Sequence, residues 1–154
     1  MVAWSPDGRY LAGVGDTLHA TVQLFVWETG SGQLIFSTPA NNWSSFAWSP
    51  DSQRLALARE RLVEIWEPSR GLKVLEYQGH PTLVWSLAWS PRGDLITSAS
   101  EVDGFVHVWE SSTGRLRSLY QGGTYTITDI AWSPDGSYLA TCNKFGGSVF
   151  VWQP

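Results

Sequence analysis

One phrase occurs four times in this chain and sets the distance between its structural units. It reads Ala-Trp-Ser-Pro, followed by Asp in three of the copies, and it occupies residues 3–8, 47–52, 88–93 and 131–136. Its Trp residues are 44, 41 and 43 positions apart, and a second Trp series, at positions 27, 66, 109 and 152, advances by 39, 43 and 43. Two Trp series that advance together indicate one supersecondary unit per repeat.

Each repeat has the pattern of short strands joined by turns. In the phrase, Pro presets φ for the first turn position and Gly accepts a positive φ at the end, so the phrase ends one strand and turns into the next. Runs rich in β-branched and aromatic residues then predict strands, which in the first repeat cover 2–4, 10–12, 22–27 and 33–37. The same plan predicts fifteen strands in all, because the last repeat stops after its third. No stretch has the apolar spacing of a helix.

Composition limits the possible partners. The 154 residues are 43% hydrophobic and 16% charged, as in a globular domain. A net charge of −4 provides no basic stripe, so neither nucleic acid nor a membrane is expected as a partner. Cys142 is the single cysteine, which excludes an intramolecular disulfide and a cysteine-based metal cluster. The sequence has neither a signal-peptide pattern at its start nor an apolar run near 18 residues, and a cytoplasmic location is expected.

The order of strands and turns, with Trp followed by an acid and with Gly79-His80 ahead of the third phrase, resembles the WD40-repeat β-propeller family, in a bacterial type of repeat that carries Ala-Trp-Ser-Pro-Asp-Gly. The resemblance covers essentially the whole chain and implies an all-β fold of four repeats, each a four-stranded antiparallel blade. It implies a single propeller domain over 1–154, with repeats at about 1–44, 45–85, 86–128 and 129–154 and a last blade without its outer strand. TolB-like or peptidase-associated propellers are the alternative, since they also repeat Ser-Pro-Asp-Gly, but the regular second Trp followed by Glu favours the WD40 type.

The family often ties a blade together with a hydrogen-bonded set of His, Ser or Thr, Asp and Trp. Here the third repeat is the one expected to form this tie, and its candidate members are His80, Ser98 or Ser100, Asp103 and Trp109. Repeats two and four are expected to be held by apolar packing alone.

Catalysis is not expected, because the chain has three histidines and no evident nucleophile with an oriented base. Asp7, Asp51 and Asp135 recur at one turn position, where bonding to the nearby backbone is a sufficient role. Neither a metal site nor a cofactor is predicted, and Cys142 is expected to be a small packed residue.

The resemblance implies a protein-binding surface where the first strand of each blade reaches the mouth of the central channel. Alternate positions share one side of a strand. The candidate residues are Asn42, Ser44, Leu83, Trp85, Thr126 and Thr128, with Tyr125 as a weaker candidate. Trp85 is the expected anchor because aromatic residues dominate interface energetics when they are desolvated. The alternative is that Trp85 only packs within the propeller.

Four repeats raise the question of how the propeller closes. An open stack leaves an apolar face bare at each end, and no segment has the composition of a cap. Family rings most often have seven or eight blades, so we expect this chain to form half of an eight-bladed ring as a homodimer with two-fold symmetry. A four-bladed ring within one chain and a segment of a longer propeller are the alternatives.

Overall fold

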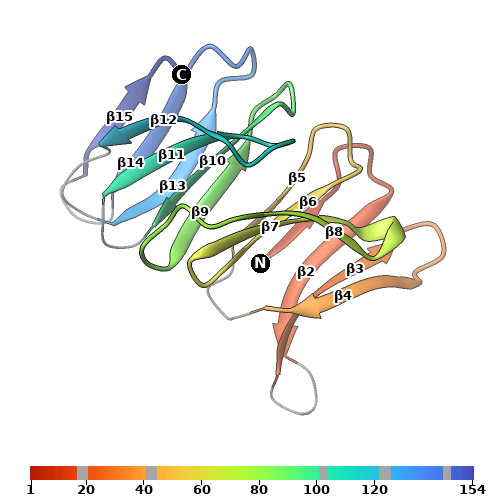
Figure 1. The fold of residues 1–154 in the computed structure, drawn as a ribbon. Coiled ribbons are helices and arrows are strands. Elements are labelled where there is room, and N and C mark those ends of the chain that lie inside the picture. The colour runs from red at the N-terminus through yellow and green to blue at the C-terminus, as the bar shows by residue number, and fades with distance from the viewer. Residues whose placement is uncertain (17–20, 41–44, 101–103, 122–125, 144–146) are drawn as a thin grey trace.

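The computed structural model describes residues 1–16, 21–40, 45–100, 104–121, 126–143 and 147–154. Fifteen strands in these ranges form four antiparallel sheets (Figure 1). Sheet one contains β1 (Val2–Trp4), β2 (Tyr10–Asp16), β3 (Val22–Glu28) and β4 (Leu34–Pro39). Sheet two contains β5 (Phe46–Trp48), β6 (Leu55–Arg59), β7 (Leu62–Glu67) and β8 (Leu72–Tyr77).

Sheet three contains β9 (Val84–Trp89), β10 (Leu95–Ser100), β11 (Phe105–Glu110) and β12 (Leu116–Gln121). Sheet four contains β13 (Ile127–Trp132), β14 (Leu139–Asn143) and β15 (Val149–Trp152). The predicted all-β class, with three four-stranded blades and a last blade of three strands, is confirmed. The one helical segment in the described ranges is the 3-10 turn η1 (Pro68–Arg70), which lies between β7 and β8. No helix in the described part of the chain is long and apolar enough to cross a membrane.

The two Trp series have one structural cause. In every sheet the Trp of the first strand and the Trp of the third strand pair with the same residue of the second strand. These central partners are Leu11, Leu55, Ile96 and Leu139. A shift of the strand register by one residue would turn each side chain to the opposite side of the sheet. The constant register therefore explains why the two Trp series advance together along the sequence.

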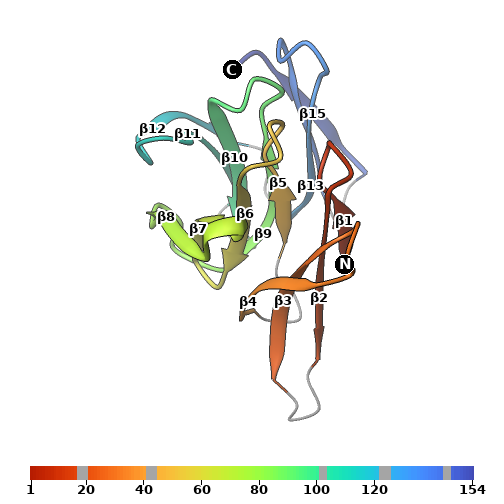
Figure 2. The same cartoon turned by 90° about the vertical axis from the view of Figure 1, so that its right-hand side faces the viewer.

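The four sheets follow one another in a curved row (Figures 1 and 2). Figure 2 shows the first strands β1, β5 and β13 along one side of the row and the fourth strands β8 and β12 along the other. We call the side with the Ser-Pro turns (5–8, 49–52, 90–93 and 133–136) the turn face, which is at the top of Figure 1. The side that carries residues 59–62 and 78–83 is the loop face.

A hydrophobic cluster fills each junction between consecutive sheets. In the first junction, Leu24 and Val26 of sheet one pack against Phe46 and Trp48 of sheet two. The clusters of the second and third junctions repeat this arrangement. Each inner sheet therefore has an N-side face that contacts the preceding sheet and a C-side face that contacts the next.

Indole groups bridge the junctions as well. The Nε1–H of Trp48 donates to the carbonyl oxygen of Ala3 at 3.3 Å, and that of Trp89 donates to the carbonyl oxygen of Ala47 at 3.0 Å. Each bond runs from the first strand of one sheet to the first strand of the preceding sheet. At the third junction the equivalent Nε1 of Trp132 is buried without a hydrogen-bond partner in the described structure, so this bond forms at two of the three junctions.

The two ends of the row are open. On the N-side face of sheet one, Val2 is 74% exposed and Trp4 is 61% exposed. On the C-side face of sheet four, Val149 is 67% exposed and Val151 is 60% exposed. The chain on its own therefore does not bury these two apolar faces, and it does not form the closed four-bladed ring that was one alternative.

Candidate interaction surfaces

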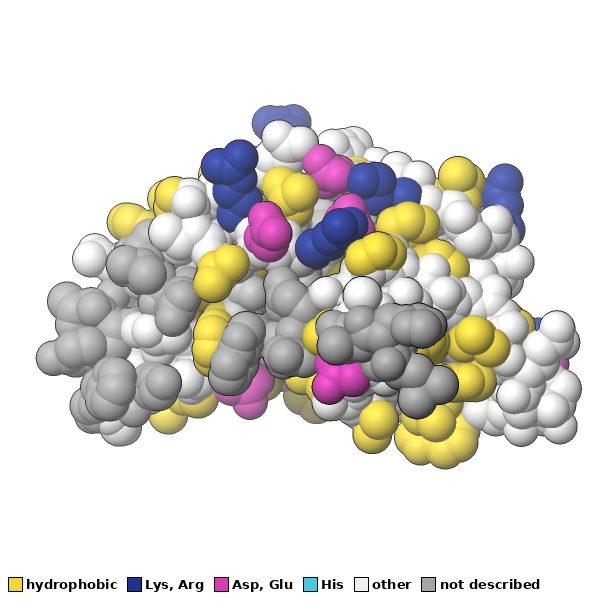
Figure 3. Space-filling view, turned by 90° about the horizontal axis from the view of Figure 1, so that it is seen from below, with side chains coloured by type: hydrophobic (Ala, Val, Ile, Leu, Met, Phe, Trp, Pro, Cys, Tyr) yellow, Lys and Arg dark blue, Asp and Glu magenta, His cyan; other side chains and the backbone are white. Residues whose placement is uncertain are grey.

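The loop face has a shallow hollow of about 350 Å³ at the entrance to sheet three. It is lined by Glu60, Arg61, Pro81, Thr82 and Leu83. The backbone N–H of Val84 donates to the carbonyl oxygen of Glu60 at 2.7 Å, which holds the segment before β9 against the β6–β7 turn. Figure 3 shows Lys and Arg side chains along the upper edge of this face, with Asp and Glu among them, and separate groups of hydrophobic side chains elsewhere.

The predicted channel residues have different positions. Leu83 lines the hollow and is 42% exposed, and Trp85 follows it in β9, half-buried. Thr126 and Thr128 belong to the start of sheet four, where the Thr128 hydroxyl lies 3.3 Å from the carbonyl oxygen of Cys142. The structure therefore places Leu83 in the hollow and Thr128 in contact with its own sheet. The remaining candidates, Asn42, Ser44 and Tyr125, lie outside the described residues.

Thr82 also lines the hollow, but its Oγ1 atom is buried and has no hydrogen-bond partner within the described structure. This hydroxyl is therefore not presented to a ligand in the hollow. Pro81 and Leu83 supply apolar surface, and Glu60 and Arg61 supply one charge of each sign.

The blade tie of repeat three contains three of its expected members in hydrogen-bond contact. His80 Nε2 lies 2.7 Å from the Ser98 hydroxyl, and Trp109 Nε1 donates to the same hydroxyl at 3.0 Å. The hydroxyl involved is that of Ser98 and not that of Ser100. Asp103 lies outside the described residues.

A second histidine joins this cluster. The ring of His107 stacks on that of His80 with centroids 3.9 Å apart, and its Nδ1 lies 2.7 Å from the hydroxyl of Tyr77 in the preceding sheet. Burial raises the pKa of Tyr77 to about 12, so this phenol stays protonated at neutral pH. The cluster is enclosed between two sheets, and its polar groups stabilise that junction.

The expectation that repeat two holds by apolar packing alone is wrong. The carboxylate of Glu64 in β7 is only 3% exposed and accepts from Trp66 Nε1 at 3.0 Å. Its other oxygen lies 3.3 Å from Lys73 Nζ and 3.8 Å from Arg59 Nη1. A buried charge requires such partners, so an ionic network replaces the His-Ser-Trp tie in this blade. In sheet four, by contrast, Trp152 packs against aromatic rings.

The recurring Asp residues stabilise the Ser-Pro turns. Hydrogen bonds from the Ser133 hydroxyl and then from the Ser137 backbone N–H lower the pKa of Asp135 to about 2. Asp7 makes the corresponding bonds and its pKa is lowered in the same way, first by the Ser5 hydroxyl. The described residues contain no group of three or more His, Cys, Asp or Glu placed to hold a metal ion.

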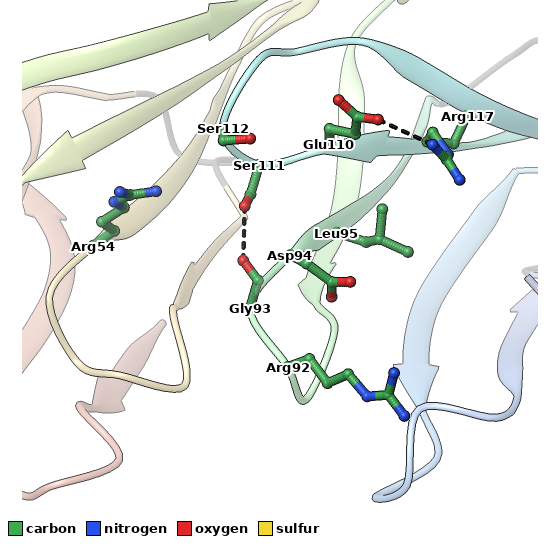
Figure 4. Close-up of a pocket in the computed structure, with 9 residues that line it drawn as sticks. All are labelled: Arg54, Arg92, Gly93, Asp94, Leu95, Glu110, Ser111, Ser112 and Arg117. Atoms are coloured by element: carbon green, nitrogen blue, oxygen red, sulfur yellow. Dashed lines mark hydrogen bonds and ion pairs between the residues drawn. The ribbon is translucent and has the colours of Figure 1, made fainter.

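A larger hollow, of about 520 Å³, lies on the turn face at the junction of sheets two and three (Figure 4). It is lined by Arg54, Arg92, Gly93, Asp94, Leu95, Glu110, Ser111, Ser112 and Arg117. Its lining contains three arginines and two acids, whereas the first hollow has one arginine and one acid. Sequence analysis missed this site, although Arg92 stands where the other three repeats carry Asp, and that departure was visible in the sequence.

Comparison with known proteins identifies the class. The family described as "WD domain, G-beta repeat" matches residues 71–110 and 114–153, which is more than half of the chain. The chain therefore belongs to the WD40-repeat family, whose members are generally non-catalytic and bind protein partners.

Similar proteins include an uncharacterized WD repeat-containing protein of Synechocystis sp., 33% identical over 64% of this chain and 28% of that protein. The periodic tryptophan protein 2 homolog of Caenorhabditis elegans is 32% identical over 68% of this chain and 12% of its own length. The COMPASS component SWD3 of Saccharomyces cerevisiae is 34% identical over 62% of this chain and 30% of its own length. The chain thus spans less than a third of these relatives.

Proposed function

We propose that this chain is a non-catalytic scaffold, built from WD40 repeats of the bacterial type, that binds a protein or peptide partner on its loop face at Leu83 and Trp85. The observation that supports this proposal is the hollow in which Leu83 is exposed beside Pro81. Trp85 lies two residues after Leu83, at the β-bulge between Val84 and Ser86, and its half-buried ring supplies the second anchor of this proposed surface. Aromatic and aliphatic anchors of this kind contribute most of the binding energy of an interface.

Peptides selected from a random display library against the whole chain test this proposal. Binding of a selected peptide is measured by calorimetry to the variants Trp85→Ala and Leu83→Ser. Leu116→Ser is the matched control, because Leu116 is 45% exposed and lies on the outer strand β12. We expect the first two variants to lose at least tenfold in affinity with unchanged melting temperatures, and the control to bind as the parent does.

The second candidate function is purely structural, with Trp85 serving blade packing. In that case Trp85→Ala lowers the free energy of unfolding by about 3–5 kcal/mol, as for a core aromatic residue, and peptides selected on the parent bind Leu83→Ser with full affinity. Either result contradicts the scaffold proposal at this site.

We also propose that a second copy of the chain covers the two open faces and completes an eight-bladed ring. The inner junctions support this arrangement because the contacts made by their first and second strands have unused counterparts at the ends. Trp48 stacks on Tyr10 of the preceding sheet, with ring centroids 5.8 Å apart and planes inclined by 17°. At the open ends, Trp4 occupies the repeat position of Trp48, and Tyr138 occupies the repeat position of Tyr10. Tyr138 is 46% exposed.

The hydrogen bond of the junction also has its counterpart. Trp48 Nε1 donates to Ala3, so Trp4 of one copy is expected to donate to the carbonyl oxygen of Ala131 in the other, a residue that is exposed here. The N-side face of one chain thus meets the C-side face of its partner. This head-to-tail contact closes with two copies when it is formed twice around a two-fold axis.

The length of the relatives favours a different packing partner for the two open apolar faces. Because the chain spans less than a third of the proteins it matches, further repeats of a longer protein could supply the missing faces. The two possibilities differ in the mass of the particle that this chain forms alone. A stable dimer supports closure by a second copy, whereas a monomer supports closure by further repeats.

A further inference from the structure

The turn of the third repeat is built differently from the other three. In repeats one and four the Ser hydroxyl bonds the Asp two positions later, at 2.7 Å for Ser5 and 2.6 Å for Ser133. In repeat three the Ser90 hydroxyl instead donates to Asp94 at 2.8 Å. Residue 92 is thereby released from the turn, and an exposed Arg92 occupies the position.

Arg92 lines the turn-face hollow together with Arg54 and Arg117. Figure 4 shows Arg54 reaching in from the loop of sheet two, with Arg92 and Arg117 at other parts of the rim. The three side chains come from two neighbouring sheets, so a ligand that contacts all of them must extend across the junction.

The acids of this hollow are already engaged. Glu110 accepts from Arg117 Nη1 at 3.1 Å through one oxygen and from the Thr113 hydroxyl at 2.7 Å through the other. Asp94 accepts from Ser90. In the described part of the chain, neither Arg54 nor Arg92 has an acidic partner within 4.0 Å. Two guanidinium groups therefore remain available on a concave surface.

We propose that this hollow binds an acidic peptide segment whose Asp or Glu side chains pair with Arg54 and Arg92. Guanidinium groups bind carboxylates through two parallel N–H···O bonds, which gives both strength and orientation. A volume of about 520 Å³ lies within the range of sites that enclose small ligands. Asp94, Glu110 and the net charge of −4 disfavour a nucleic acid, because a continuous polyanion would have to pass these two carboxylates beside the arginines. The site is on the face opposite to the loop-face hollow and does not depend on the function proposed above.

Fluorescence anisotropy tests this site with a labelled peptide that contains four alternating Asp and Glu residues flanked by Gly and Ser. The control peptide replaces these four residues by Asn and Gln. We expect the acidic peptide to bind, the amide peptide not to bind, and the affinity to fall with added salt. Arg92→Asp and Arg54→Gln should each weaken binding about tenfold, the loss expected for one charge-assisted contact. Arg92→Asp restores the residue found in the other repeats, so the fold should tolerate it, and Arg92→Gln provides a second variant.

Arg9→Gln is the matched control, since it removes the same charge from the turn face outside the hollow. It should leave the affinity unchanged. Equal binding of the acidic and amide peptides, or equal affinity of the parent and both hollow variants, would overturn the proposal. Displacement of the peptide by inorganic phosphate at a concentration at which chloride has no effect would also overturn it, because the site would then recognise a small anion.

Discussion

The inner junctions and the two ends of the row use the same repeat positions with opposite results. Trp48 and Trp89 are each 8% exposed, whereas Trp4 at the equivalent position is 61% exposed. On the other face, Val26 and Val108 are buried almost completely, whereas the equivalent Val151 is 60% exposed. The residue types are the same, so burial here depends on the presence of a neighbouring sheet.

The two end faces therefore present the same apolar residue types as the inner faces. Fully burying a Val or Leu side chain contributes about 1.5–3 kcal/mol relative to exposure, and Trp4 presents a still larger surface. An end face with the residues of an inner face is therefore stabilised when it packs against another such apolar face. The comparison leads to three predictions, which follow from the largest expected effect to the smallest.

The largest effect is expected for a Trp at an inner junction. Trp89→Ala removes a buried ring and its bond to Ala47 and should lower the free energy of unfolding by about 3–5 kcal/mol. Trp4→Ala should change the stability of the separated chain by less than about 1 kcal/mol, because the ring is exposed there. Urea denaturation at nanomolar protein concentration measures both, and equal losses for the two variants would mean that the ends are already packed in one chain.

A smaller effect is expected within the buried polar cluster of the second junction. Ser98→Ala removes the hydroxyl that bonds both His80 and Trp109, and the two nitrogens remain buried. The expected loss is about 1–3 kcal/mol, the cost of leaving such groups without a partner. Ser112→Ala in an exposed turn is the control and should cost less than about 0.5 kcal/mol. A loss for Ser98→Ala as small as that of the control would show that the tie does not stabilise the junction.

The smallest effect concerns pH and the exposed turn of sheet four. The pKa of Asp135 is about 2 in the folded chain and 3.8 as its ordinary value. A carboxylate with a depressed pKa stabilises the fold above its ordinary value, and this stabilisation is lost as pH falls from about 4 to about 2. Asp135→Asn should therefore lower the melting temperature slightly at pH 6 and leave it unchanged at pH 2. The same difference at both pH values would contradict the role assigned to this carboxylate.

Local sequence features predicted the fold well for a physical reason. The Pro and Gly of each turn and the constant spacing of the two Trp series fix strand pairing within each repeat, and these are short-range properties. Glu64 was missed because its partners Lys73 and Arg59 come from two other strands. A charged residue in the middle of the apolar run 62–66 was the available signal.

The candidate surfaces were harder to predict because they depend on how the sheets meet. Leu83 was predicted from the resemblance, but the hollow around it also uses the β6–β7 turn. The turn-face hollow is formed by side chains of two sheets, and its arginines lie far apart in the sequence. Residue spacing within one repeat does not contain this information.

Sedimentation equilibrium of the whole chain at micromolar concentration tests the central claim most directly. We expect a particle with twice the mass of one chain, which dissociates in the variant Val151→Arg and persists in the variant Leu116→Arg. A monomer that unfolds cooperatively at the same concentration would contradict closure of the two apolar faces by a second copy.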